Sequence, residues 1–364
     1  MSRRRSLAYA AGGLGAATVA ALATGAVVER RVVKARRAGA AEADRLGALR
    51  STARTVTTDD GVDLFAEVDE VAPYDGPTRP TKRRRAQDEL TILFVHGYAL
   101  NLDCWHFQRE ALRGKHRMAF YDQRSHGRSG RSDREHAIID QLGDDLVRVV
   151  EELAPTGDVV LVGHSMGGMS IFAFAEKHPE LFTSRVRGVA LISTTAGGLR
   201  PHRTLSRWIP DGLGQTLAPR VVAALAKAPE LIDSARRPGS NIGFLVADRF
   251  AFGRGDVPPA QVEFLDEMLG GTSFDVLAEF FPSFSALDKF EHLAPFLHVP
   301  TTVICGTKDK LTSIGHSRKL AQRIPGARLV ECEGAGHMVI FEDHAKVNEE
   351  IERLVVSAHR DDNR

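Results

Sequence analysis

The sequence predicts an α/β fold in which eight short strands alternate with helices and an α-helical cap is inserted before the last strands. Short apolar runs rich in valine, isoleucine and leucine alternate with longer amphipathic segments, which is typical of strands buried on both faces. Between residues 197 and 296 this alternation stops, and helical segments carry ten of the chain's 18 phenylalanines. A chain of 364 residues with 43% hydrophobic content is large enough for one core domain with an insertion.

The N-terminal region predicts a membrane anchor. Arg3–Arg5 precede the uncharged segment Leu7–Val28, which at about 1.5 Å per residue is long enough to cross the hydrocarbon core. The segment is rich in alanine, glycine and threonine, so a twin-arginine-like export signal and a cytoplasmic N-terminal helix remain alternatives. We interpret residues 1–28 as an anchor or signal-like segment that makes the protein membrane-associated, and residues 29–53 as a helical spacer.

Residues 54–196 form the first part of the predicted core. Asp59-Asp60-Gly61 between two β-branched runs is a hairpin sequence. The strands that we expect are Arg54–Thr58, Val62–Val68, Leu90–Val95, Arg117–Tyr121, Val159–Val162, Val186–Ser193, Thr301–Cys305 and Ala327–Cys332. The helices that we expect are Asn101–Arg113, His136–Leu153, Met169–Lys177, Ser313–Arg323 and Val347–Val356.

The segment 197–296 is expected to form a helical cap over the strand ends, where α/β sheets bind their ligands. Its phenylalanines either fill the cap's own core or line an apolar pocket, and we expect both, for different rings. Residues 297–358 return to the core, and 359–364 are expected to be a disordered tail.

The stretch Gly163-His164-Ser165-Met166-Gly167 joins an expected strand to an expected helix. A serine between two glycines in that context is typical of a nucleophile elbow, because a Cβ on either side of the sharp turn would clash. The turn is expected to expose the Ser165 hydroxyl and to place the backbone N–H of Met166 at the helix N-terminus, where it stabilises an oxyanion. The alternative is a chance turn rich in glycine and serine.

A second loop supplies the other oxyanion donor. His96-Gly97-Tyr98 follows a buried strand, and Gly97 allows the turn that points the backbone N–H of Tyr98 at the same place as that of Met166. His96 itself is expected only to brace this loop.

The loop 122–129 resembles a catalytic loop in isolation. We interpret Asp122 and Arg124 as a buried pair that braces it, and His126 as a structural or rim residue.

An acid and a base follow in the last third of the chain. Asp309 comes directly after the strand expected at Thr301–Cys305, whereas the loop after the preceding strand, 194–197, offers no acid. His337 lies on a glycine-rich loop after the last expected strand. His344 lies nearby at a helix start and is the weaker base candidate.

Serine, acid and histidine in this chain order, together with the His96-Gly97 turn, resemble the α/β-hydrolase superfamily. The resemblance covers the body from Arg54 to Val356 and points to the lidded esterase/lipase and epoxide-hydrolase-like branch. It implies a mostly parallel, eight-stranded sheet with helices on both faces and a cap after the sixth strand. It also implies a catalytic triad of Ser165, Asp309 and His337, and oxyanion donors at Tyr98 and Met166. Members that open epoxides attack with an aspartate, so the serine argues against that chemistry. Ser125 stands where the family's loop usually has glycine.

We therefore expect a serine hydrolase of lipophilic carboxylic esters. The alternatives are an acyltransferase or perhydrolase with the same triad, or a non-catalytic homologue that binds a small ligand. A net charge of +1 gives no electrostatic case for nucleic acid as a partner, and the three cysteines show neither a disulfide framework nor metal spacing. The expected partner is a small-molecule ester, with no cofactor and no metal. The sequence leaves open the natural substrate, the oligomeric state and the membrane orientation.

Overall fold

The computed structural model of the chain describes residues 46–72, 90–199 and 247–361. The predicted anchor, most of the predicted spacer and the first half of the predicted cap lie outside these residues. Among the residues that are described, no helix is long and apolar enough to cross a membrane.

The eight strands form one sheet in the order β1-β2-β4-β3-β5-β6-β7-β8. The pairs β1–β2 and β2–β4 are antiparallel, and every other neighbouring pair is parallel. The strands are β1 Ala53–Thr57, β2 Asp63–Asp69, β3 Thr91–Val95, β4 Arg117–Tyr121, β5 Val159–His164, β6 Val186–Ile192, β7 Thr301–Gly306 and β8 Arg328–Cys332. This topology confirms the predicted fold class. The prediction was possible because buried strands are marked by short apolar runs in their own sequence.

The α-helices are α3 His106–Leu112, α4 Ile139–Leu153, α5 Met166–Lys177, α6 Pro179–Arg185, α11 Pro259–Gly270, α12 Phe274–Ala286, α13 Ile314–Arg323, α14 Val339–Glu342 and α15 His344–Asp361. The helix predicted at Asn101–Arg113 is divided between a 3₁₀ turn, Leu102–Trp105, and α3. The sequence analysis did not anticipate α6, a short helix that begins with a proline directly after α5.

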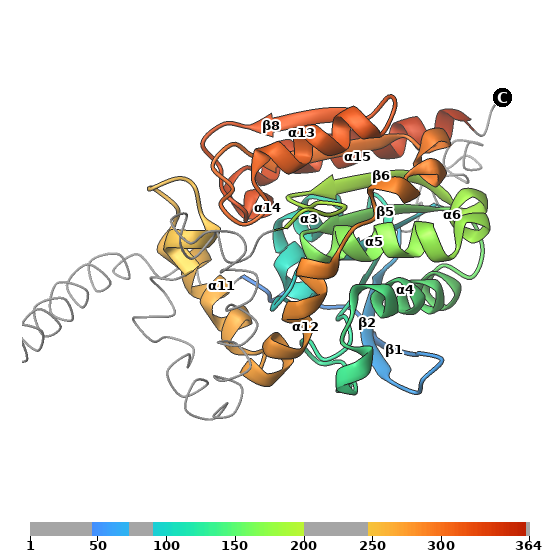
Figure 1. Ribbon diagram of the computed structural model, residues 1–364, viewed down its shortest axis with the longest axis horizontal. Coiled ribbons are helices and arrows are strands. Elements are labelled where there is room, and N and C mark those ends of the chain that lie inside the picture. Colours follow the sequence, from blue (N-terminus) through green and yellow to red (C-terminus); the bar gives the residue numbers. More distant parts are fainter. Residues whose placement is uncertain (1–45, 73–89, 200–246, 362–364) are drawn as a thin grey trace, which may run out of the picture.

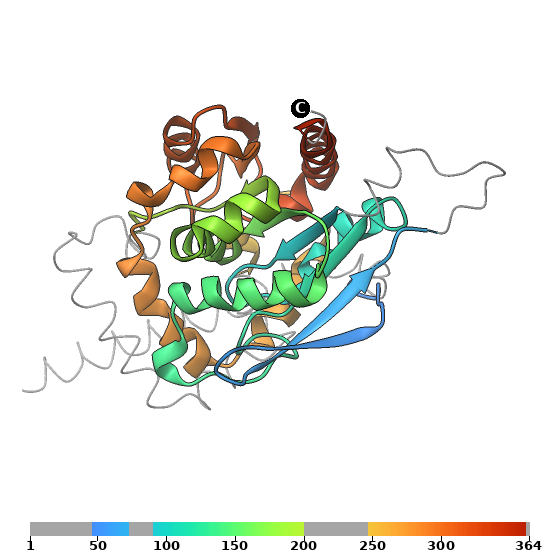
Figure 2. The same cartoon turned by 90° about the vertical axis from the view of Figure 1, so that its right-hand side faces the viewer.

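The helices cover the sheet on both faces, as Figures 1 and 2 show. Successive strand residues point to opposite faces. Ile92 and Phe94 of β3 pack in the same cluster as α3, α11 and α15, whereas Leu93 and Val95 pack with α4, α5, α6 and α13. The sheet is therefore buried on both sides, and its functional groups are confined to the ends of the strands.

The described part of the cap contains α11 and α12, which lie beside the end of the sheet where the parallel strands terminate (Figure 1). Its buried phenylalanines do not form a separate cap core. Phe252 and Phe264 join the cluster on one face of the sheet, and Phe290 and Phe296 join the cluster on the other. Phe280 and Phe284 of α12 belong to a third cluster, which includes Met166 and the partly buried Tyr98. The cap thus packs directly on the elements predicted to hold the oxyanion donors.

Polar contacts fix α12 to the core along its length. Arg131 donates to Asp275 at 3.0 Å and to Glu279 at 2.7 Å. At the other end of α12, the hydroxyl of Ser283 accepts from the backbone N–H of Ile139 at 2.9 Å.

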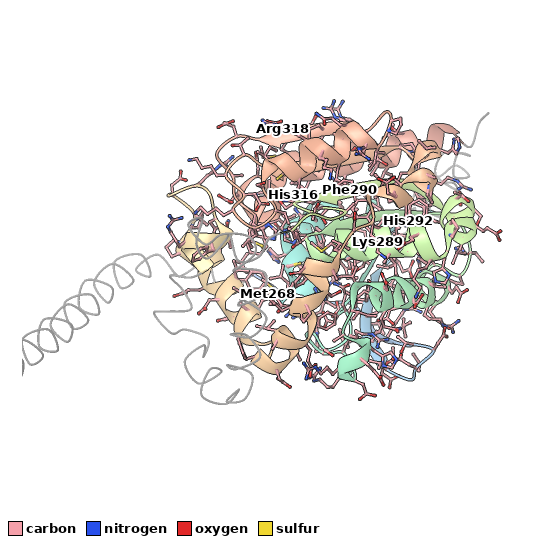
Figure 3. The ribbon with its side chains drawn as sticks, in the orientation of Figure 1. Met268, Lys289, Phe290, His292, His316 and Arg318 are labelled. Carbon is pink, nitrogen blue, oxygen red and sulfur yellow. The ribbon has the colours of Figure 1, made fainter. Side chains whose placement is uncertain are left out.

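The segment after α12 is held in the same way. The Lys289 ammonium binds Asp140 of α4 at 2.5 Å and also Glu176 of α5, and His292 lies 3.1 Å from Glu176 (Figure 3). These ion pairs set the side of the sheet on which the chain re-enters the core.

The three cysteines are buried and free. In the β7–β8 pair, Cys332 lies opposite Gly306, whereas Cys305 lies opposite Glu331. The offset of one residue sends the two thiols to opposite faces of the sheet, so the interpretation as unpaired thiols is confirmed.

Candidate active site

Ser165 occupies a strained turn between β5 and α5. Its φ of 52° and ψ of −116° lie outside the regions that residues with a Cβ normally adopt, which is worth on the order of 1–3 kcal/mol of strain. The turn is so tight that a Cβ on Gly167 would lie 2.0 Å from the carbonyl oxygen of Val95. The glycine is therefore required by the close approach of β3, and the serine side chain, half-buried, projects from the turn.

The two predicted oxyanion donors flank this turn. Met166 is the first residue of α5, so its N–H has no acceptor within the helix. Tyr98 follows β3 in the loop that touches the serine: a Cβ on Gly97 would lie 3.2 Å from the Cβ of Ser165. The structure thus brings the Gly97-Tyr98 turn and the serine turn together.

Asp309 and His337 form a buried pair on the loops after β7 and β8. The Asp309 Oδ2 lies 2.9 Å from the His337 Nδ1, and because a carboxylate only accepts, Nδ1 carries the proton and Nε2 keeps its lone pair. The other carboxylate oxygen accepts from the backbone N–H groups of Leu311 and Thr312 at 2.8 and 2.9 Å.

Burial raises the pKa of the Asp309 carboxyl, but the positive charge of a protonated His337 and the hydrogen bonds from His337, Leu311 and Thr312 outweigh it, so the pKa lies below its ordinary value. The carboxylate is therefore ionised at neutral pH and orients the imidazole. His344, the weaker base candidate, instead stacks on the ring of Phe107 at 4.4 Å.

Within the described part of the chain, Ser165 and His337 do not hydrogen-bond directly. They are connected through their neighbours, since His164, next to the serine, binds the His337 carbonyl oxygen at 3.0 Å. Contacts between a nucleophile and its base are often long in the free enzyme and shorten when substrate binds. The serine, the acid–histidine pair and the Tyr98 loop all lie at one end of the sheet.

Comparison with known proteins places this geometry in a family. The model of the alpha/beta hydrolase family matches residues 92–350, which is more than half of the chain. The chain belongs to the alpha/beta hydrolase family. Its relatives with established activities indicate hydrolase activity in general.

Two curated proteins illustrate the range of this alpha/beta hydrolase's relatives. The non-heme chloroperoxidase CPO-A1 of Kitasatospora aureofaciens is 28% identical over 287 residues, which cover 77% of this chain and 90% of that protein. The bifunctional esterase/perhydrolase DCH of Acinetobacter calcoaceticus is 26% identical over 307 residues, covering 81% and 97%.

Among solved structures, a thermophilic esterase from Thermogutta terrifontis is similar, with a TM-score of 0.64 and 24% identity. The match covers 85% of this chain and all of that one. At this identity the likeness establishes the fold alone.

The loop 122–129 is braced differently from the prediction. Arg124 does not pair with Asp122; its guanidinium binds Asp145 at 2.5 and 2.6 Å and Asp60 at 2.8 and 2.9 Å. The Asp122 carboxylate instead accepts the backbone N–H groups of Leu102 and Arg128. Both residues are buried and hold the loop. Apart from Arg128, which belongs to the loop, their partners lie too far away in sequence for the loop itself to reveal them.

The two loop histidines support the site without titrating near neutral pH. The His96 Nε2 accepts the backbone N–H of Gln123 at 2.8 Å, which agrees with a bracing role. His126 is fully buried, so it is not a rim residue; its Nδ1 binds the Arg124 carbonyl and its ring packs on Phe280 of α12. Burial lowers the pKa of His96 to about 4 and that of His126 to about 3.

Ser125, which replaces the family's usual glycine, adopts a left-handed conformation with φ 64°. Its hydroxyl accepts the backbone N–H of Ser132 at 2.9 Å, which compensates for the strain. The local geometry of the loop therefore tolerates this departure.

Sequence reasoning missed three sets of contacts around the site, made by the side chains of Thr312, Tyr98 and His164. The Thr312 hydroxyl lies 2.9 Å from Asp309 Oδ2 and 2.7 Å from the Ser193 carbonyl oxygen. The Tyr98 hydroxyl binds the carbonyl of Leu277 in α12, and the Tyr98 ring meets Phe284 edge to face at 4.9 Å. The third is the bond from His164 described above. Except for the local contact of Thr312 with Asp309, these bonds join segments far apart in sequence, and no local pattern signals them.

Candidate metal ligands gather at one place in the described residues. Asp133, Glu135 and His136 bring their ligand atoms within 4.8 Å of one another on the loop before α4. Both acids are exposed, and exposed acids commonly gather without an ion. The group includes none of Ser165, Asp309 and His337, so we assign it no part in the site.

Proposed function

We propose that this protein hydrolyses carboxylic esters through an acyl-enzyme on Ser165. The observation that carries the proposal is the buried Asp309–His337 pair, held with its Nε2 lone pair available, at the same end of the sheet as a serine in a strained turn. A strained, glycine-flanked serine beside an oriented imidazole suits nucleophilic catalysis better than a purely structural role.

In the proposed reaction, the His337 Nε2 accepts the Ser165 proton as Oγ attacks the ester carbonyl carbon. The backbone N–H groups of Met166 and Tyr98 stabilise the negative oxygen of the tetrahedral intermediate. The bond to the alcohol oxygen breaks, and His337 donates its proton to the leaving alcohol. Water then attacks the acyl-enzyme by the same route, which releases the acid and restores the serine. Asp309 stabilises the charged His337 in both halves of the reaction.

The apolar side chains that pack around the serine turn support a lipophilic acyl or alcohol group. Phe280 and Phe284 of α12 form one buried cluster with Met166 and Met169 of α5. The chain length that fits is a property to be measured.

The test is hydrolysis of p-nitrophenyl esters from acetate to palmitate by the parent protein and by Ser165→Ala. We expect turnover of the parent with an optimum at a medium or long chain, and a loss on the order of a millionfold in the folded Ser165→Ala protein. Residual turnover above about a hundredth of the parent rate would contradict the nucleophile assignment.

A second candidate, transfer of the acyl group to hydrogen peroxide, is favoured by the names of two relatives, a chloroperoxidase and a bifunctional esterase/perhydrolase. The acyl-enzyme would be the same, with peroxide replacing water as the attacking group. Adding peroxide to the ester assay distinguishes the two functions: a perhydrolase diverts the acyl group to the peracid, whereas a simple esterase continues to release the free acid.

A further inference from the structure

His164 is the last residue of β5, directly before the proposed nucleophile, and its side chain is completely buried. Its Nε2 lies 3.0 Å from the backbone carbonyl oxygen of His337. The two imidazole rings are also in contact, with centroids 4.9 Å apart. The residue next to the serine therefore touches both the main chain and the ring of the proposed base.

The direction of this hydrogen bond fixes the chemical state of His164. A carbonyl oxygen only accepts, so Nε2 carries the proton. Nδ1 has no hydrogen-bond partner among the described residues and faces the Gly97 turn, where a Cβ would lie 2.9 Å from it. The titratable groups around the ring are His337, Asp309 and His96; burial and the charge of His337 lower the pKa of His164 to about 3. His164 thus stays neutral and does not compete for the proton that His337 accepts.

The His337 loop is held at three consecutive residues, each by a different part of the molecule. The N–H of Gly336 donates to Glu342 at 2.5 Å, and the N–H of Met338 donates to the Ala251 carbonyl at 3.0 Å. The middle contact, on His337 itself, comes from His164. Of these three, only the bond from His164 connects the loop to the strand that carries Ser165.

We propose that His164 is a positioning residue: its hydrogen bond to the His337 carbonyl sets the distance between the His337 imidazole and the Ser165 hydroxyl. The inference rests on the proposed function, since it assigns His164 a part in serine activation. A shift of about 1 Å between reacting groups can cost about a hundredfold in rate. Loss of this bond should therefore slow acylation while leaving substrate affinity nearly unchanged.

Two matched variants separate the hydrogen bond from the packing. In His164→Gln, the amide nitrogen is as many bonds from the main chain as Nε2 is in histidine, so the donor is kept. His164→Met has nearly the same length and volume but no donor. Their rates of labelling by an alkyl fluorophosphonate, followed by intact mass, report activation of the serine whatever the natural substrate is. Their kcat and KM for a p-nitrophenyl ester are measured in parallel, as a function of pH.

We expect His164→Met to lower the labelling rate and kcat by about tenfold to a hundredfold with KM within about twofold, and His164→Gln to stay within about fivefold of the parent. The pH at which kcat/KM falls on the acid side should be the same in all three proteins, because His164 is neutral throughout. A Met variant that labels as fast as the parent would overturn the proposal, even if it is less stable to urea. A folded Gln variant as slow as the Met variant, or a shift of the acid limb in either, would also overturn it.

These outcomes are independent of the ester proposal. If the parent is labelled at Ser165 but hydrolyses no ester, the proposed substrate class fails, and the labelling rates of the variants still test His164. If the parent is folded and is not labelled at all, both proposals fail.

Discussion

Replacing Asp309 with asparagine should inactivate the site without unfolding the protein. One carboxylate oxygen accepts the backbone N–H groups of Leu311 and Thr312, and the amide oxygen of an asparagine can keep those two bonds. The amide nitrogen then faces the His337 Nδ1 at the 2.9 Å position of the lost Oδ2. Because that nitrogen donates, it binds His337 only in the tautomer with its lone pair on Nδ1 and its proton on Nε2.

With a proton on Nε2, His337 cannot accept the proton of Ser165. When the orienting acid of a serine–histidine site is replaced by its amide, kcat falls by about ten thousandfold. The assay is p-nitrophenyl ester hydrolysis at neutral pH, with circular dichroism and urea unfolding to show that the variant is folded. Asp288→Asn, on the segment that leads from α12 to β7, serves as the matched control and should retain activity.

A folded Asp309→Asn protein with more than about a tenth of the parent kcat would refute the assignment of the orienting acid. Loss of activity together with loss of the folded state would show that the Asp309 carboxylate is needed for the stability of the fold. In that case, the labelling rate of the residual folded fraction decides between the two roles.

Three further predictions follow from buried groups. The pKa values of His126 and His164 are lowered from 6.5 to about 3, so between pH 6.5 and 3 the unfolded chain binds protons that the folded chain excludes. The free energy of unfolding in urea should therefore fall below pH 6.5, by roughly 1 kcal/mol per pH unit for each histidine. A free energy of unfolding that does not change with pH in this range would contradict the prediction. Gly167→Ala should yield no folded protein, because the added methyl meets the Val95 carbonyl at 2.0 Å; soluble, active variant would contradict that geometry. Tyr98→Phe removes the hydroxyl bond to α12 and keeps the ring, so its unfolding free energy should fall by about 1 kcal/mol with ester turnover retained. An unchanged stability would mean that the contact contributes nothing.

The sequence could predict the sheet and the order of the site loops because both are local signals. A buried strand can be recognised from its own apolar, β-branched residues, as in Val159–Val162, and the glycines around Ser165 indicate the tight turn directly. The loop positions of Asp309 and His337 follow from the strands that precede them. The parallel order of β7 and β8 brings these two loops to the same end of the sheet. The pairing of Asp309 with His337 was an expectation from the family resemblance, and the two side chains lie 2.9 Å apart in the structure.

Contacts between distant segments could not be predicted in this way. Arg124 was assigned to the acid two residues before it, but its partners come from α4 and from the β1–β2 hairpin. The cap phenylalanines were expected to divide between a core of the cap and an apolar pocket, whereas the buried rings in the described part of the cap join clusters on the sheet's two faces and at the α5 turn. Hydrophobicity indicates that a ring is buried and does not indicate which surface buries it.

The central claim, an activated nucleophile at residue 165, is tested most directly by labelling with an alkyl fluorophosphonate followed by peptide mass spectrometry. The account predicts one adduct per chain, located on Ser165 and absent from the Ser165→Ala protein. An adduct on another serine, or a folded parent protein that stays unlabelled at a large excess of reagent, would contradict it.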